Sequence, residues 1–283
     1  MCQSTELDAG RSVEWLDQYM QQGYVFPLQA MSTQRALMYR EQLEDMESRY
    51  KNDPDVRRLA IGHSNSLLPF VDEITRLPTV LDAVEAILGP NLLVWNASFF
   101  IKEPNTRDFI SWHQDLTYWG LTESHEVTAW IALSASTPQS GCVKFLPGSH
   151  QQNIVEHRDT FHEDNLLSRG QEIAVDVDEQ DAVNVQLMPG EMSLHHGQVF
   201  HGSHANNSGD RRIGLAIRYI TTNMKQTTGD KTNAKLVRGV DDYQHFNLTD
   251  TPKAMLHDDD RAAVIKNVET TKKFLFAGTK NQN

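Results

Sequence analysis

The sequence has little of what marks secreted or membrane-bound proteins. Its 283 residues include only two cysteines, Cys2 and Cys142, which argues against a disulfide framework and favours a reducing compartment. No segment reaches the roughly 18 consecutive apolar residues of a membrane span. Acidic residues interrupt the first twenty positions, so no signal peptide is expected. The sequence therefore predicts a cytoplasmic protein.

Positive charge is also scarce. Acidic residues outnumber basic ones by 38 to 26, and the formal net charge is -12. The longest basic clusters are the pairs Arg211-Arg212 and Lys272-Lys273, which are too short to attract a phosphate backbone or a lipid surface. We therefore expect a small-molecule substrate as partner, and neither nucleic acid nor a membrane. The oligomeric state stays open.

Hydrophobic residues make up 39% and charged residues 23% of the chain, which is typical of a globular protein. We interpret residues 1–283 as a single domain with a helical part over about 12–90, a β core over about 92–220 and a C-terminal extension over about 221–283. Apolar periodicity and capping residues predict helices. These are residues 13–22, 32–50 and 78–88, with a further helix near 258–268.

Beyond residue 91 the helical period disappears, and β-branched and aromatic residues become frequent. Short strands at close spacing favour an antiparallel barrel or jelly roll. The predicted strands are residues 92–102, 127–133, 143–146, 172–177, 182–187, 192–195 and 213–220.

The segment from Trp112 to Asp115 contains an H-x-D motif. A strand through this segment would point His113 and Asp115 to the same face, because side chains alternate along a strand. With a second histidine, they would form the facial triad that binds Fe(II) and leaves three positions open for an oxo acid and dioxygen. On its own, however, an H-x-D motif is usually a solvated polar pair.

A downstream segment offers the second histidine among His195, His196, His201 and His204, and the spacing does not choose between them. We favour His201, because Gly202 follows it and lets the backbone approach a ligand closely. Further along the same segment, an arginine precedes a predicted strand. Its planar fork suits the distal carboxylate of a dicarboxylic co-substrate. This arginine is Arg212.

Taken together, these motifs resemble the phytanoyl-CoA dioxygenase family of Fe(II)- and 2-oxoglutarate-dependent oxygenases. The resemblance runs in order over about residues 93–220, and Gly23-Tyr24 resembles the start of the family's domain. The matching motifs are H-Q-D at 113–115, V-T-A-W-I-A-L at 127–133, G-C at 141–142, L-P-G-S-H at 146–150, P-G-E at 189–191, H-G-S at 201–203, and Arg212.

The resemblance implies that His113, Asp115 and His201 bind Fe(II). It further implies that Arg212 and Ser203 hold 2-oxoglutarate beside Trp130. The implied fold is mainly β with flanking α-helices, around a double-stranded β-helix core, also called a jelly roll or cupin-like core. The implied reaction uses O2 to hydroxylate an unactivated C–H bond of a small organic metabolite, with release of succinate and CO2.

Within the family, halogenating members have a small residue at the position of Asp115, so the carboxylate here favours hydroxylation. A desaturase or halogenase of the same family, and a non-catalytic jelly roll that binds metal or 2-oxoglutarate, are the alternative functions. Two segments, residues 112–121 and 193–203, look closest to bacterial members that oxidise small compounds, including aminoalkylphosphonate hydroxylases.

The substrate pocket is the least constrained prediction. Asn96 and Ser98 should alternate onto one strand face, and two aromatic residues follow the H-x-D motif. A solvated strand face and ordinary core aromatics are the alternative interpretations. The candidate pocket residues are Asn96, Ser98, Tyr118, Trp119, His196 and Gln198.

Overall fold

The computed structural model describes residues 5–275 except 118, 123–124, 168 and 228–229. The predicted pocket residue Tyr118 therefore lies outside the described residues. Among the residues that are described, no helix is long and apolar enough to cross a membrane.

The helices follow local signals in the sequence. Ser32 accepts a hydrogen bond from the backbone N–H of Arg35 and so caps the second helix. Proline stands at the start of α3, α5 and α6, where a missing N–H costs nothing. The helices predicted over 32–50 and 78–88 are confirmed, whereas those between residues 54 and 75 were missed because each is short. The helices are α1 (Thr5–Gln22), α2 (Thr33–Arg49), α3 (Pro54–Gly62), α4 (Ser64–Leu67), α5 (Pro69–Thr75), α6 (Pro78–Leu88) and α7 (Asp258–Leu275).

The strands agree with the predictions best where they are long. The strand predicted over 92–102 has those bounds, whereas three predicted strands shrink to two or three residues. The first strand, which begins two residues after α1 ends, was missed in the sequence. The strands are β1 (Tyr24–Gln29), β2 (Leu92–Lys102), β3 (Ile110–His113), β4 (Glu126–Ala132), β5 (Lys144–Phe145), β6 (His157–Asp159), β7 (Gln171–Ile173), β8 (Val183–Asn184), β9 (Glu191–His195), β10 (His201–Ser203), β11 (Arg212–Thr221), β12 (Asn233–Arg238) and β13 (Asn247–Leu248).

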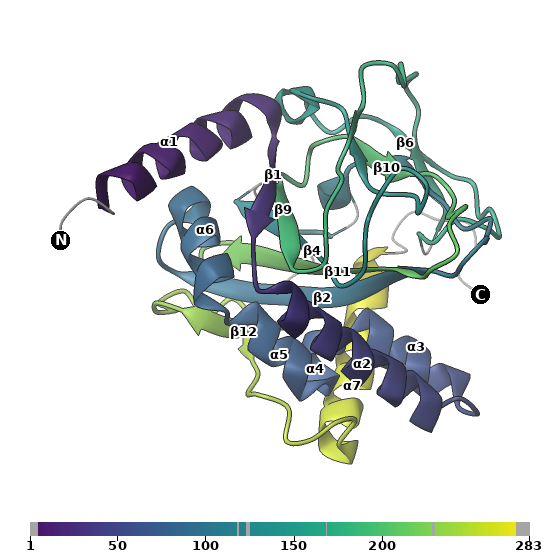
Figure 1. Cartoon of the computed structure of the whole chain (residues 1–283). Coiled ribbons are helices and arrows are strands. Elements are labelled where there is room, and N and C mark those ends of the chain that lie inside the picture. The colour runs from purple at the N-terminus through teal and green to yellow at the C-terminus, as the bar shows by residue number, and fades with distance from the viewer. Residues whose placement is uncertain (1–4, 118, 123–124, 168, 228–229, 276–283) are drawn as a thin grey trace.

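Two sheets form the β core. The larger sheet has seven strands in the order β1-β9-β4-β11-β2-β12-β13, and the smaller has four in the order β3-β10-β5-β8. Strands β1, β12 and β13 of the larger sheet come from outside residues 92–220. Helices α2 to α5 and α7 lie on one side of β2 and β11, and β10 and β6 lie on the other side (Figure 1). The molecule therefore has three layers.

Strand β11 shows why the layers pack in this way. Its residues Ile213, Leu215, Ile217 and Tyr219 are fully buried in the apolar core that the larger sheet shares with the helices. The alternate residues point to the smaller sheet, where Ala216 joins a second apolar cluster with Trp130 and Phe145. The functional side chains described below lie beside this second cluster, between the two sheets.

Candidate functional site

Two neighbouring strands of the smaller sheet carry the candidate metal ligands. His201 on β10 lies directly opposite His113 on β3 in the strand register. The prediction that one strand would carry both His113 and Asp115 is wrong, because β3 ends at His113 and Asp115 begins a 3-10 turn over Asp115–Thr117. The turn, and not strand alternation, brings the carboxylate back to the imidazoles.

The three side chains converge on one point. Each offers a ligand atom, and these atoms lie within 4.8 Å of one another. One carboxylate oxygen of Asp115, Oδ1, is 3.4 Å from Nε2 of His113 and 3.9 Å from Nε2 of His201. Two imidazoles and a carboxylate on one side of a point are the ligand set of a mononuclear non-haem Fe(II) site.

Backbone contacts orient both imidazoles. Nδ1 of His113 lies 2.9 Å from the carbonyl oxygen of Ser111, and Nδ1 of His201 lies 3.0 Å from that of Val199. In the neutral tautomer that donates from Nδ1, the lone pair of Nε2 is free for a metal. Such contacts from the outer nitrogen are typical of histidines that bind metals.

The protonation states also suit a metal. Burial lowers the pKa of His201 well below its ordinary value, so this imidazole stays neutral. Burial alone would raise the pKa of Asp115, but the neighbouring His113 and His195 hold it well below its ordinary value. At neutral pH the site thus offers the neutral imidazole and the charged carboxylate that metal binding requires.

The geometry distinguishes the four downstream histidines. His201 joins the cluster of ligand atoms, whereas His195 is buried with Nε2 3.9 Å from Oδ2 of Asp115. His204 is an exposed side chain that contacts Glu179. The ring of His196 accepts a hydrogen bond from the backbone N–H of Gln198.

Arg212 is a buried cation without a hydrogen-bond partner. Its side chain is fully buried, and among the described residues none of its three guanidinium nitrogens has a partner. The guanidinium lies 5.4 Å from the centre of the Trp130 ring. Gly214 makes this stacking possible, because a Cβ at that position would lie 1.8 Å from the same ring. A buried, unpaired guanidinium is costly in free energy unless a ligand completes it.

Lys102 lies beside Arg212 and was missed in the sequence. The two residues face each other across β2 and β11. Nζ of Lys102 donates to Oγ of Ser203 at 2.6 Å and to the carbonyl oxygen of His204. Burial, and then the charge of Arg212, lower the pKa of Lys102 to about 6. The signal was its position in the strand, since Lys102 continues the alternation that begins at Asn96 and Ser98.

Arg212, Lys102 and Ser203 therefore form a buried basic cluster, called the basic pocket below, of which Ser203 also lines the cavity beside the metal ligands. No carboxylate among the described residues pairs with either basic side chain. An incoming carboxylate would find the guanidinium fork, the lysine and the hydroxyl together. The pocket thus fits one end of a dicarboxylic acid such as 2-oxoglutarate, whose other end would reach the metal.

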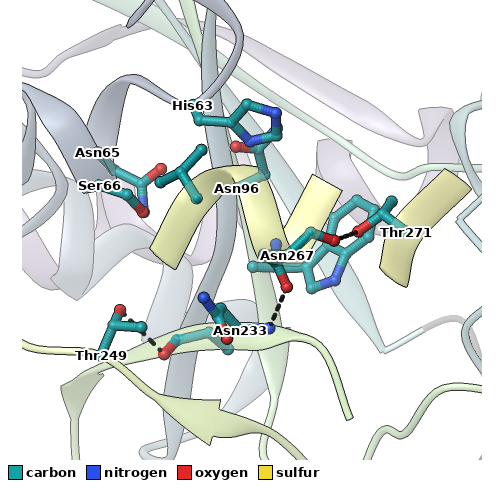
Figure 2. Close-up of a pocket in the computed structure, with 11 residues that line it drawn as sticks. His63, Asn65, Ser66, Asn96, Asn233, Thr249, Asn267 and Thr271 are labelled. Atoms are coloured by element: carbon teal, nitrogen blue, oxygen red, sulfur yellow. Dashed lines mark hydrogen bonds between the residues drawn. The ribbon is translucent and has the colours of Figure 1, made fainter. Parts of the chain in front are cut away.

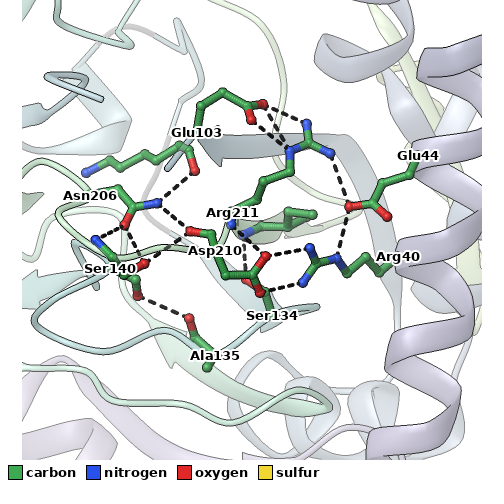
Figure 3. A network of polar contacts seen from close by, with 12 residues as sticks. Arg40, Glu44, Glu103, Ser134, Ala135, Ser140, Asn206, Asp210 and Arg211 are labelled. Carbon is green, nitrogen blue, oxygen red and sulfur yellow. Dashed lines mark hydrogen bonds and ion pairs between the residues drawn. The ribbon is translucent and has the colours of Figure 1, made fainter. Parts of the chain in front are cut away.

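A network of ion pairs holds the chain that leads into Arg212 (Figure 3). Arg40 on α2 contacts both carboxylate oxygens of Asp210, at 2.7 and 2.8 Å. Arg211 bridges Glu103 with Glu47 of α2. The amide of Asn206 donates to the backbone carbonyl oxygens of Lys102 and Asp210. These contacts fix the adjoining ends of β2 and β11, from which the basic pocket is built.

A small cavity of about 30 Å³ adjoins the metal ligands. It contains Ser203 and Trp130 of the predicted co-substrate site. Several further residues were not singled out in the sequence, because they come from separate strands and carry no motif. The lining residues are Phe100, Ile110, His113, Asp115, Thr128, Trp130, Val143, His195, His201, Gly202, Ser203, Ala216 and Arg218.

The predicted pocket residues that the structure describes fall into three groups. Ser98 and Trp119 both contact Arg218, which lines the metal cavity. Asn96 lines a different cavity, together with His63, Asn65 and Asn267 (Figure 2). His196 and Gln198 line neither of these two cavities.

The comparison with known families agrees with this geometry. Residues 12–214 match the family described as phytanoyl-CoA dioxygenase (PhyH). The chain belongs to the phytanoyl-CoA dioxygenase family. This is a family of Fe(II)- and 2-oxoglutarate-dependent oxygenases, so the resemblance seen in the sequence is confirmed.

Curated relatives match over part of the chain. A probable alpha-ketoglutarate-dependent hypophosphite dioxygenase from Stutzerimonas stutzeri is 30% identical over 152 residues, 53% of this chain and 52% of that protein. Peroxisomal phytanoyl-CoA dioxygenase from Bos taurus is 28% identical over 154 residues, 52% of this chain and 45% of that protein. The matched region thus spans about half the length of these relatives.

Solved structures match over most of the chain. A non-heme monooxygenase, ThoJ, is 30% identical with a TM-score of 0.82, covering 92% of this chain and 96% of that one. CytC3 with Fe(II) and alpha-ketoglutarate is 20% identical with a TM-score of 0.63, covering 86% of this chain and 94% of that one. The predicted double-stranded β-helix fold is therefore confirmed.

Proposed function

We propose that the protein is an Fe(II)- and 2-oxoglutarate-dependent hydroxylase of a small organic molecule. His113, Asp115 and His201 would hold the iron, and Arg212, Lys102 and Ser203 would hold the distal carboxylate of 2-oxoglutarate. Bound iron, 2-oxoglutarate and dioxygen would supply the oxidising power to hydroxylate an unactivated C–H bond, with succinate and CO2 as co-products.

The observation that carries this proposal is the unpaired guanidinium of Arg212. A metal triad alone would suit many functions, but a fully buried arginine that finds no hydrogen-bond partner among the described residues favours an anionic ligand. Lys102 adds a second donor, which among the described residues donates to the hydroxyl of Ser203 and to one backbone carbonyl group. The metal cavity includes both Ser203 and the three ligands, so one dicarboxylic molecule would engage both parts.

The protein's own side chains would mainly bind and orient the reactants. The Trp130 ring packs against the Arg212 guanidinium and limits where a carboxylate can lie. Apolar residues such as Phe100 and Val143 line the same cavity and exclude water from it. Holding reactants in one orientation in a dry cavity is the protein's part of such a reaction.

Asp115 supports hydroxylation over halogenation. Its carboxylate is within reach of both imidazoles, so it would fill the iron position that a halide needs. The similarity to ThoJ, a non-heme monooxygenase, and to a probable hypophosphite dioxygenase also supports oxygenation.

The first test is co-substrate binding without oxygen. Addition of 2-oxoglutarate to anaerobic protein with Fe(II) should produce a visible charge-transfer absorption and raise the melting temperature. In the presence of oxygen, a panel of small molecules should then reveal a compound that stimulates oxygen uptake and succinate release. Absence of the absorption, with iron shown to be bound, would overturn the proposal. A 2-oxoglutarate complex that no compound stimulates would instead favour a non-catalytic binding protein.

A further inference from the structure

A second buried arginine, Arg218, lies on the same face of β11 as Arg212. The two residues are six positions apart, which places their Cα atoms about 20 Å apart along an extended strand. Arg218 lines the metal cavity together with His113, Asp115 and His201. It is therefore a second source of positive charge at the site, well separated from the basic pocket at Arg212.

The guanidinium of Arg218 is held in place but not neutralised. Within the part of the chain that the structure describes, it donates one hydrogen bond, from Nη1 to Oγ of Ser98 at 2.8 Å. The rings of Phe100 and Trp119 flank it, with centroids 5.8 and 5.6 Å from its central carbon. A hydroxyl group and two aromatic rings orient an arginine, and they leave most of its five N–H donors available.

No acidic side chain among the described residues forms an ion pair with Arg218. Two acidic residues lie close enough to favour its charge, Asp115 and Glu126. Asp115 would be committed to the metal. Glu126 accepts a hydrogen bond from the backbone N–H of Gly197 and forms no ion pair with Arg218, and burial raises its pKa well above its ordinary value, which favours the neutral form. Arg218 is only 8% exposed, and a buried charge without a counterion is unfavourable.

Binding of Fe(II) and 2-oxoglutarate would not neutralise the positive charge of Arg218. The charges of Fe(II) and Arg212 would be balanced by Asp115 and the two carboxylates of 2-oxoglutarate, and Lys102, neutral or protonated, would add no negative charge to offset Arg218. Arg218 would then remain as uncompensated positive charge in the cavity that the three metal ligands line. A third reactant that carries a negative charge would complete the balance.

We propose that Arg218 binds an anionic group of the substrate, a carboxylate or a phosphonate, and so selects acidic small molecules. The proposal rests on the oxygenase function proposed above. The anion would lie against Ser98 and Arg218, which would place the rest of the substrate along the cavity toward the metal.

The test measures charge selectivity in anaerobic protein loaded with Fe(II) and saturating 2-oxoglutarate. The probes are propionate, methylphosphonate and propionamide, which is the neutral counterpart of propionate. Binding of each probe is followed by its effect on the visible charge-transfer absorption. In the unaltered protein, at least one of the two anions should bind at least tenfold more tightly than propionamide, and the preferred anion identifies the group.

The variants separate binding from a structural role. Arg218→Gln should lose the preference for the anion but keep its affinity for propionamide and, within about threefold, for 2-oxoglutarate. Arg218→Lys should restore part of the preference. Ser98→Ala should weaken anion binding several-fold, because the guanidinium loses its anchor. Arg58→Gln, which changes an exposed arginine, is the matched control and should behave as the unaltered protein.

Any of three results would overturn the inference. The first is that the anions bind no better than propionamide, and the second is that the preference for the anion survives in Arg218→Gln. The third is that the anions act only by displacing 2-oxoglutarate from the pocket at Arg212. If neutral compounds also stimulate succinate release, the oxygenase function stands without this substrate class. If 2-oxoglutarate itself does not bind, both proposals fail.

Discussion

Arg212 begins strand β11 and Arg218 lies six positions further along the same face, and their surroundings differ. Arg212 has no hydrogen-bond partner among the described residues, faces Lys102 across the sheet and adjoins the ion pairs of Arg211. Arg218 is anchored to a serine and flanked by two rings. The first setting suits a fixed dicarboxylate, and the second suits the anionic group of a substrate. One strand thus provides two separate positive sites with the metal ligands beside it.

Removal of a metal ligand should impair the use of both 2-oxoglutarate and the substrate. It should cause the largest loss of turnover. His201→Ala leaves two ligands, so turnover should fall by about a thousandfold or more, because metal ligands act as a unit. Bound iron and succinate release are the measurements. A conserved melting temperature in the metal-free state would show that the fold survives. Turnover within tenfold of the unaltered protein would rule out His201 as a ligand.

Removal of Arg212 should weaken the binding of 2-oxoglutarate but not the binding of Fe(II). Arg212→Met keeps the length of the side chain and removes about two charge-assisted hydrogen bonds, so the 2-oxoglutarate requirement should rise by about 100-fold. Binding of Fe(II) without co-substrate should not change. Equilibrium titrations of both ligands check this, and unaltered co-substrate affinity in the variant would refute the assignment.

Lys102 should make the affinity for 2-oxoglutarate depend on pH. Its pKa of about 6 means that the amine of the free protein is neutral above pH 6 and must take up a proton to pair with a carboxylate. Affinity for 2-oxoglutarate should therefore fall as the pH rises above 6, by up to about tenfold per pH unit. Lys102→Met should bind more weakly at pH 6 and lack this slope. The same slope in the variant would assign the titration to another group.

Loss of an ion pair from the network around Arg211 should have the smallest effect on stability and on 2-oxoglutarate affinity. Asp210 is largely exposed, so loss of its pair with Arg40 should cost less than about 1 kcal/mol of stability. In Arg40→Ala, the affinity for 2-oxoglutarate should fall by no more than about threefold. Chemical denaturation and co-substrate titration provide both numbers, with Arg58→Ala as control. A loss as large as that in Arg212→Met would mean that the network itself forms the pocket.

Much of this arrangement could be predicted from the sequence because it is local. The H-x-D and H-G-S motifs and Arg212 are short patterns that carry chemistry, and the alternation of β2 and β11 is readable from residue types. The turn that brings Asp115 back to His113 could not be predicted, since three residues of 3-10 helix have no distinct periodicity.

Contacts between strands of the sheet could not be predicted from the sequence for a different reason. Lys102 acquires its role from its register opposite Arg212, and Arg218 acquires its role from Ser98 on a strand 120 positions away in sequence. A single chain without aligned relatives does not reveal which distant residues pair. Even correct alternation did not distinguish Ser98, which contacts Arg218, from Asn96, which lines another cavity.

The most direct test is the dissociation constant of 2-oxoglutarate, measured anaerobically with Fe(II) in the unaltered protein, Arg212→Met and Arg218→Gln. If Arg212 and Arg218 bind different anions, 2-oxoglutarate should bind about 100-fold more weakly to Arg212→Met. Its dissociation constant should change by no more than about threefold in Arg218→Gln. Equal losses in both variants, or none in either, would contradict the account.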